Sequence, residues 1–187
     1  MIKMGTGSFG NGKRYNSPVP LFLVGSLQIF SNESLINLKG LDNIASIGDS
    51  LLILFNNKLI DFDGLNNLTS IGNILCITKN ESLTSVDGLN NLISIGNIQG
   101  VYGGMSVSDN IGTLVSLAGN ALCINSNYSL TNLDGLSNLT TIEGDLHINS
   151  NSVLPTSTSE EFANRVTISG ETFFRDEEYI PQGLNRF

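Results

Sequence analysis

Apolar positions recur along the chain at a nearly constant spacing. Four Gly-Leu pairs mark the repeat, Gly40-Leu41, Gly64-Leu65, Gly88-Leu89 and Gly135-Leu136, with a weaker copy at 111–114. The successive spacings are 24, 24, 22 and 25 residues. A unit this short cannot bury its own apolar face, so we expect the repeats to stack on one another.

Further apolar columns keep the same register and alternate with a period of two, which predicts strands with one face turned inward. The clearest columns are Leu27, Leu51, Leu75, Leu122 and Leu146, then Ile29, Ile53, Ile77, Val101, Ile124 and Ile148, then Leu35, Leu59, Leu83, Val107, Leu130 and Leu154. Two more columns begin at Ile44 and Ile47. Three short strand-like stretches per repeat predict an all-β fold, a right-handed parallel β-helix (solenoid) of about five to six repeats.

A polar column lies between two of the apolar ones. It holds Asn32, Asn56, Asn80, then Gly104, then Asn127 and Asn151. Asparagine tolerates left-handed backbone geometry, and stacked amides form hydrogen-bonded ladders, so we predict that these are corner residues in a structural ladder. The alternative is glycosylation, because Asn32, Asn67, Asn80, Asn127 and Asn138 all begin Asn-x-Ser/Thr sequons. Their repeat-locked positions favour the structural interpretation.

The motif Gly-Leu-x-Asn-Leu-Thr-Ser-Ile-Gly-x-x-Leu-x-Ile-x-x-Asn-x-x-Leu at 64–83 resembles the receptor L-domain-like repeat. The resemblance covers roughly 24–154 and implies a leucine-rich right-handed β-helix. Because that family includes ligand-binding domains of growth-factor receptors and surface proteins of microbes, it also implies recognition of another molecule without catalysis. The chain departs from the family pattern in the short repeat after Leu89.

The ends of the chain differ from the repeats. We expect a flexible basic N-terminal arm over 1–23, β-solenoid repeats over 24–156, and a C-terminal cap and extended tail over 157–187. Ser157-Thr-Ser-Glu160 has the pattern of a capping box, which predicts a short helix to about Arg165, followed by a strand-like 166–168. This helix would cap the open end of the solenoid.

Charge is distributed unevenly. The net charge is -8, with nine basic residues over the whole chain, which argues against a nucleic-acid partner. The arm carries Lys3, Lys13 and Arg14, so it is +3 and the remainder is -8 minus 3, or -11. A basic arm on an acidic body can dock onto a neighbouring copy. The apolar run at 19–24, interrupted by Pro20, is too short for a signal peptide or a membrane span.

Several residues are candidates for partner contacts. The irregular stretch at 99–105 lacks both the column leucine and the corner asparagine; it is either a tolerated bulge or a binding surface with Tyr102 and Met105 as contacts. Lys13 and Arg14 in the arm are further candidates. The aromatic tail, with Phe173, Phe174 and Tyr179, either wraps back on the body or inserts into a neighbour.

The search for catalytic or metal-binding residues gives weak candidates. Cys76 and Cys123 take the same column position with one repeat between them, about 9.6 Å apart, which predicts two free thiols. His147 lies next to Cys123 in that column, but a nucleophilic dyad needs a third group. Asp42, Asp63, Asp87 and Asp134 fit turn capping better than calcium binding. We therefore expect no catalytic residue, no metal and no cofactor.

These observations predict a non-catalytic structural or assembly protein, whose rigid body binds neighbouring subunits in a virion, phage or surface assembly. The alternative is a cell-surface or secreted recognition module for a protein or glycan. An enzyme, such as a β-helical polysaccharide lyase, would need a carboxylate cluster on one face, and the columns contain none. The sequence does not fix the localisation, although a virion or a cell surface is favoured.

Overall fold

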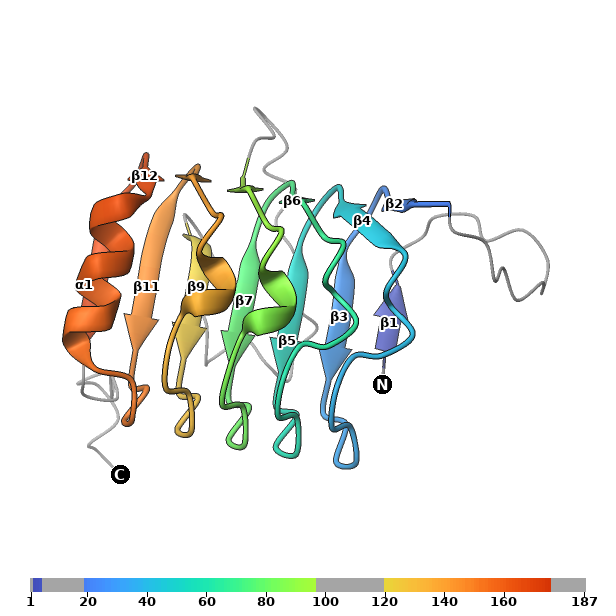
Figure 1. Cartoon of the computed structure of the whole chain (residues 1–187), viewed down its shortest axis with the longest axis horizontal. Helices are drawn as coiled ribbons and strands as arrows, with labels where there is room; N and C mark the ends of the chain where they lie inside the picture. Colours follow the sequence, from blue (N-terminus) through green and yellow to red (C-terminus); the bar gives the residue numbers. More distant parts are fainter. Residues whose placement is uncertain (1, 5–18, 97–119, 176–187) are drawn as a thin grey trace, which may run out of the picture.

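The computed structural model describes residues 2–4, 19–96 and 120–175, which are mostly strands in two sheets of parallel strands with one α-helix (Figure 1). In spatial order, sheet A contains β1 (Ile2–Met4), β3 (Leu27–Phe30), β5 (Leu51–Leu54), β7 (Leu75–Thr78), β9 (Asn120–Asn125), β11 (Asp145–Asn149) and β13 (Thr172–Arg175). Sheet B contains β12 (Thr167–Ile168), β10 (Thr141–Ile142), β8 (Ser94–Ile95), β6 (Ser70–Ile71), β4 (Ile44–Ile47) and β2 (Leu21–Leu23). All pairs are parallel except β1 with β3.

Residues of the same predicted apolar column lie opposite one another in neighbouring strands of the sheets. Leu27 lies opposite Leu51, and Leu51 opposite Leu75, while Ile47 and Ile71 are paired in sheet B. Their side chains face a single main core between the two sheets, in which most members are fully buried. Stacking of equivalent residues therefore fills the interior, as the alternation of apolar positions predicts.

A third side of each repeat connects the end of sheet A with the next strand of sheet B. Two of these connections contain 3-10 helices, η1 (Asp87–Leu89) and η2 (Asp134–Leu136). A Cβ atom at Gly64, Gly88 or Gly135 would collide with the backbone carbonyl of the preceding repeat. The Gly-Leu pair therefore recurs because the glycine lets neighbouring backbones approach closely, while the leucine enters the core.

One of the predicted repeats is not part of the stack at its predicted place. β9 pairs directly with β7 and β10 directly with β8, so the predicted repeat that included Val101, Gly104 and Val107 is not inserted between them. The 22-residue spacing was therefore wrongly interpreted as a stacked unit. A physical reason lies at Gly104, since glycine in the asparagine column would leave the buried amide and N–H of Asn80 without their acceptor.

The C-terminal end is closed by α1 (Thr156–Arg165), which confirms the predicted helix. The predicted capping box is wrong, because the helix starts after Pro155 and Ser157 lies within its first turn. Phe162 is buried in the main core, and the Arg165 guanidinium donates hydrogen bonds to the carbonyls of Leu136 and Ser137. Beyond the helix, β12 and β13 continue the two sheets.

Two segments of the predicted N-terminal arm belong to the sheets. β1 forms the edge of sheet A beside β3, and β2 forms the edge of sheet B beside β4. Leu23 of β2 is buried in the main core. In the described ranges, no helix is long and apolar enough to cross a membrane.

Candidate functional site

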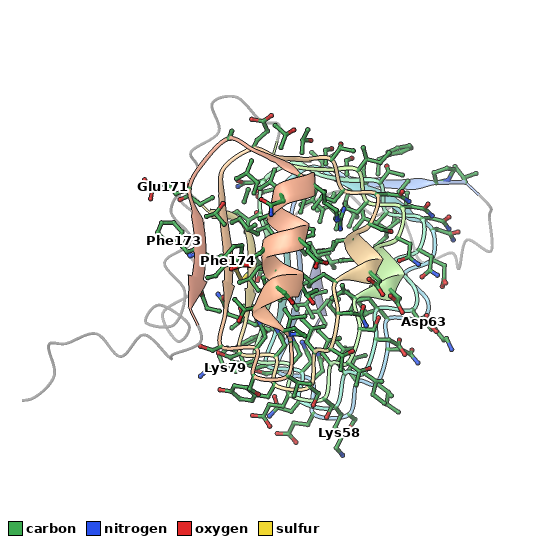
Figure 2. All side chains as sticks on the ribbon, turned by 60° about the vertical axis from the view of Figure 1, so that its left-hand side comes forward. Lys58, Asp63, Lys79, Glu171, Phe173 and Phe174 are labelled. Atoms are coloured by element: carbon green, nitrogen blue, oxygen red, sulfur yellow. A yellow bond between two sulfur atoms is a disulfide. The ribbon has the colours of Figure 1, made fainter. Side chains whose placement is uncertain are left out.

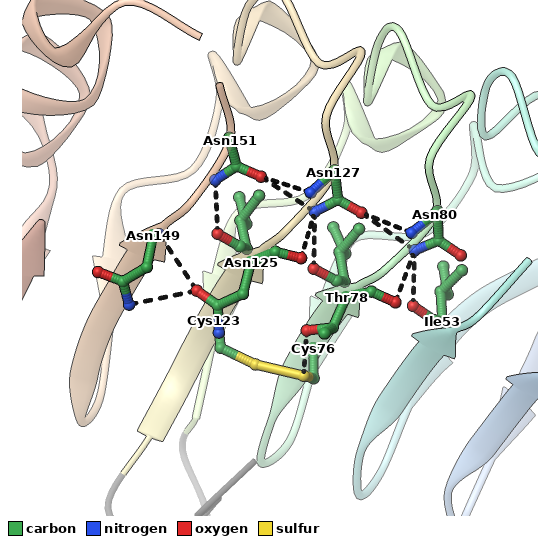
Figure 3. Close-up of a disulfide and its surroundings, with 11 residues drawn as sticks. Ile53, Cys76, Thr78, Asn80, Cys123, Asn125, Asn127, Asn149 and Asn151 are labelled. Atoms are coloured by element: carbon green, nitrogen blue, oxygen red, sulfur yellow. Dashed lines mark hydrogen bonds between the residues drawn. A yellow bond between two sulfur atoms is a disulfide. The ribbon is translucent and has the colours of Figure 1, made fainter. Parts of the chain in front are cut away.

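The five corner asparagines form a continuous ladder on the inside of the corner that follows sheet A. The Oδ1 atom of Asn56 accepts hydrogen bonds from the backbone N–H and the amide of Asn32, at 3.0 and 2.9 Å. The same pair of bonds links Asn56 to Asn80. It also links Asn80 to Asn127 and Asn127 to Asn151 (Figure 3). Each inner amide also donates to backbone carbonyls, so these buried polar groups are satisfied.

The left-handed backbone lies one residue earlier than predicted. Positive φ angles of 50° to 57° occur at Ser31, Phe55, Lys79, Ser126 and Ser150, each directly before a ladder asparagine. Such a conformation costs a non-glycine residue about 1–2 kcal/mol. It reverses the chain so that the following amide points inward, where the hydrogen bonds of the ladder offset the cost.

The ladder also separates the sequons into two groups. Asn80 and Asn127 are fully buried, so their amides are not accessible to a glycan in the folded chain. Asn32 is half-buried, and its amide donates a hydrogen bond into the ladder. Asn67 and Asn138 are exposed on the third side, where their amides donate to the carbonyls of Asp42 and Asn90 in the preceding repeat, at 2.6 Å each. All five asparagines therefore take part in contacts between repeats.

Cys76 and Cys123 form a disulfide between β7 and β9, so the prediction of two free thiols was wrong (Figure 3). Their Cα atoms are 4.7 Å apart because the strands are direct neighbours, whereas the prediction assumed an intervening repeat. His147 lies opposite Cys123 in the sheet register. Because the sulfur is already bonded to Cys76, the pair cannot act as a nucleophilic dyad.

A second apolar cluster lies on the outer face of sheet A. This outer patch consists of Leu52, Leu54, Ile74, Cys76 and Cys123, which are at most 6 % exposed. Described apolar side chains that pack against it are Phe30 and Phe55. The central strands of sheet A are therefore buried on both faces, which the alternating pattern alone does not predict.

At the C-terminal end of sheet A, the two tail phenylalanines point in opposite directions (Figure 2). The Phe173 ring stacks on the imidazole of His147, with 4.4 Å between centroids and 24° between planes. Phe174 packs against the main core. Burial lowers the pKa of His147, and the Asp145 carboxylate raises it in part. In the described stretch, 172–175, the tail thus continues the sheet of its own chain.

The four aspartates beside the Gly-Leu turns have different contacts. Asp42 accepts a hydrogen bond from the Gly40 N–H at 2.8 Å, and Asp63 lies 3.6 Å from the exposed ammonium of Lys39. Asp87 and Asp134 begin η1 and η2. Within 2–4, 19–96 and 120–175, no group of three or more His, Cys, Asp and Glu residues could hold a metal ion.

The N-terminal end of sheet B exposes apolar side chains that the sequence did not single out. Val19, Phe22 and Val24 are 66 %, 66 % and 84 % exposed. They belong to the apolar run at 19–24, which the sequence excluded as a signal peptide or membrane span without predicting another role for it. β2 has a single neighbouring strand, β4, in the part of the chain that the structure describes. We call Val19, Phe22 and Val24 the N-terminal apolar edge.

The predicted partner contacts fall into two groups. Phe173 and Phe174 belong to β13, with Phe174 in contact with the core and Phe173 on His147. Tyr102, Met105, Lys13, Arg14 and Tyr179 lie outside the described residues. The described candidates therefore contribute to the fold of their own chain, and the N-terminal apolar edge is the more accessible surface.

Comparisons with known proteins leave the family open. No family model matches the sequence, and neither the curated proteins nor the solved structures contain a significant match.

Proposed function

We propose that this chain is a non-catalytic assembly protein, with a rigid β-solenoid body whose N-terminal apolar edge binds a neighbouring protein subunit. The exposure of Phe22 in the edge strand β2, and of Val19 and Val24 next to that strand, is the observation that carries this proposal. Large apolar side chains gathered at one edge are typical of protein interfaces. An unpaired strand edge also offers backbone hydrogen bonds to a partner strand.

The backbone of β2 supports this mode of binding. The Leu21 N–H donates to the Asn43 carbonyl, and the Leu23 carbonyl accepts from the Gly48 N–H. Alternate residues of a parallel strand bond to opposite sides, so the N–H and carbonyl of Phe22 are directed away from β4. A partner strand would add to this edge, with its side chains packed on Phe22 and Val24.

The opposite end of the stack has a different surface. α1 covers it, and its exposed side chains include Glu160, Glu161, Asn164 and Arg165. Because that end is polar, it does not complement the N-terminal apolar edge. Contact between two copies would therefore be isologous, edge to edge, and would close as a dimer instead of growing into a fibre.

For the body itself, we propose a right-handed β-helix of the receptor L-domain-like type. The constant register in both sheets supports a coil in which each repeat contributes one strand to each sheet. The strong preference of parallel crossovers for the right hand supports the handedness. Such a body would serve as a rigid spacer in a virion, phage or surface assembly.

A recognition module is the second candidate function. Ile36, Ile60, Tyr128 and Val153 are 54 %, 43 %, 42 % and 54 % exposed near the corner that follows sheet A, and they come from different repeats. A row of this kind along the solenoid axis could contact an extended protein or glycan. Tyr128→Ala should then weaken ligand capture without changing the melting temperature, while Phe22→Ser should leave capture intact.

The deciding experiment measures molar mass by light scattering for the full chain and for the Phe22→Ser/Val24→Ser variant. We expect the full chain to assemble and the variant to be a monomer with an unchanged melting temperature. Ile93→Ser is the matched control, because Ile93 is 51 % exposed but lies away from the edge. A full chain that is monomeric alone and in the presence of candidate partner subunits would refute the assembly function.

A further inference from the structure

The two ends of the main core differ in how completely they are covered. At the C-terminal end, α1 lies against the last repeats and places Phe162 in the core. At the N-terminal end, opposite α1, Leu21, Leu35 and Leu41 pack against the same core but are only half-buried (Figure 1). The residues that take the positions of Leu35 and Leu41 in later repeats are fully buried: Leu59, Leu83 and Leu130, and Leu65, Leu89 and Leu136. The first repeat therefore leaves one end of the core partly open.

Phe22 presents both of its backbone hydrogen-bonding groups at this open end. Leu21 and Leu23 bond to the β4 side, so the N–H and the carbonyl of Phe22 are directed away from β4. In an antiparallel pair, a residue with both groups directed at the partner strand exchanges two hydrogen bonds with the residue opposite. Two β2 strands related by a two-fold axis at Phe22 would form such a pair, with each Phe22 opposite the other.

Pro20 favours this register over a slipped one. A slip that placed Phe22 opposite Pro20 of the other copy would leave the carbonyl of each Phe22 without a donor, because proline has no N–H. An axis at Phe22 uses both groups of that residue and makes the two exposed phenyl rings direct cross-strand neighbours. Paired aromatic rings add to the stability of such a contact.

The charges of the first repeat also fit a second copy. The whole chain has a net charge of -8, so two copies repel each other unless they meet at a surface without net charge. Residues 19–25, which contain β2, carry no charged side chain. Directly before its Gly-Leu pair, the first repeat has Lys39, where the later described repeats have aspartate, and Asp42 follows three residues later. A cation and an anion at the same end give complementary charges in a contact between two identical surfaces.

We propose that the subunit bound by the N-terminal apolar edge is a second copy of this chain, and that the two β2 strands pair antiparallel about a two-fold axis at Phe22. The choice of this partner rests on the proposed function, because the same edge binds it. Sheet B then continues from one copy into the other, and the open ends of the two cores face each other. The resulting dimer has α1 at both of its outer ends.

The test is disulfide trapping with Phe22→Cys, and Val19→Cys is the matched control. The two native cysteines are bonded to each other, so each variant has one free thiol. Opposed residues in a hydrogen-bonded antiparallel pair have Cα atoms about 5.5 Å apart, which is within the range of a disulfide. Val19 is as exposed as Phe22, but its two copies would lie about 20 Å apart, because an axis at Phe22 places residue 19 three positions away on each side. We expect Phe22→Cys to form a covalent dimer in air severalfold faster than Val19→Cys, as measured by intact mass.

A second measurement uses the unaltered chain, so it does not depend on a substitution in the contact. Hydrogen exchange at the Phe22 N–H, followed by NMR, should slow as the protein concentration rises, because this N–H is bonded to the second copy. The Gly48 N–H, which donates to the Leu23 carbonyl within one chain, is the internal control and should change much less. Protection of the Phe22 N–H that does not vary with concentration would mean that the edge is filled within one chain, and it would overturn the proposal.

Two further outcomes would overturn the pairing of β2 strands while leaving the assembly function in place. In the first, Phe22→Ser/Val24→Ser abolishes assembly, but Phe22→Cys cross-links no faster than Val19→Cys, so the edge binds its subunit in another way. In the second, the full chain is monomeric alone and assembles through this edge with a different protein subunit. Preferential cross-linking of Phe22→Cys, together with a mass of the full chain that rises with concentration, would support both the function and the partner.

Discussion

Sheet A and sheet B have equivalent inner faces but different outer faces. Both face the main core with leucine and isoleucine columns in constant register. Outside, sheet B has small half-exposed hydroxyl side chains, such as Ser46, Ser70 and Thr141, whereas sheet A has the buried outer patch and a disulfide. The repeat thus determines the inner face of each sheet, whereas the outer faces of the two sheets differ in burial.

Removal of the disulfide should have the largest effect on stability, because this covalent link is present in sheet A and not in sheet B. It joins residues 47 positions apart, and closing a loop of that length stabilises a folded chain by about 4 kcal/mol. Cys76→Ala/Cys123→Ala should therefore lower the free energy of unfolding by about that amount, as measured by urea titration. If the double variant were as stable as the parent, the covalent link between β7 and β9 would not contribute to the free energy of unfolding.

A pair of single substitutions compares the two outer faces directly. Leu54→Ala removes a fully buried side chain from the outer patch and should cost about 3 kcal/mol in unfolding free energy. Ser70→Ala on sheet B should stay within about 0.5 kcal/mol, because its side chain is partly solvated. Equal effects in urea titrations would mean that sheet A is solvated on its outer side, like sheet B.

The corner after sheet A is buried, whereas the corner after sheet B lies near solvent. Asn80 accepts from the backbone N–H and the amide of Asn56 in the buried ladder, so Asn80→Ala should cost about 2 kcal/mol by leaving that N–H unpaired. Asn73 lies at the corner after sheet B, where its amide donates to the Asp49 carboxylate near solvent. We expect Asn73→Ala to cost less than about 1 kcal/mol, and comparable losses in thermal unfolding would contradict the difference.

Periodicity in the sequence predicts the sheets well but predicts the interruption poorly. The leucine and isoleucine columns give the register of β3, β5, β7, β9 and β11, and the asparagine column gives the ladder, because both depend on contacts between equivalent residues. The repeat at 99–107 was wrongly predicted because Val101 and Val107 stand near the expected column positions, although β9 pairs directly with β7. That single error placed the two cysteines too far apart and hid the disulfide.

The apolar edge and the outer patch were missed for a different reason. Exposure of Phe22 depends on β2 being the last strand of sheet B, and Leu52 is buried although it lies on the outer face of sheet A. Neither property leaves a periodic signal. A clue to the patch is present in β5, where four apolar residues follow one another, the pattern of a strand that is buried on both faces.

The smallest expected effect is a pH dependence confined to sheet A, because its outer face carries His147, whereas the strands of sheet B carry no titratable side chain. Burial against Phe173 lowers the pKa of His147 below its ordinary value of 6.5, with Asp145 opposing the shift. A His with a lowered pKa in the folded state favours the neutral form, so its contribution to stability is present above pH 6.5 and is lost as the pH falls below that value. The melting temperature, followed by circular dichroism, should therefore fall between pH 7.5 and pH 5.5 more in the parent than in His147→Gln. Because carboxylates titrate mainly below this range, an equal fall in both proteins would mean that protonation of His147 does not weaken the contact between β11 and β13.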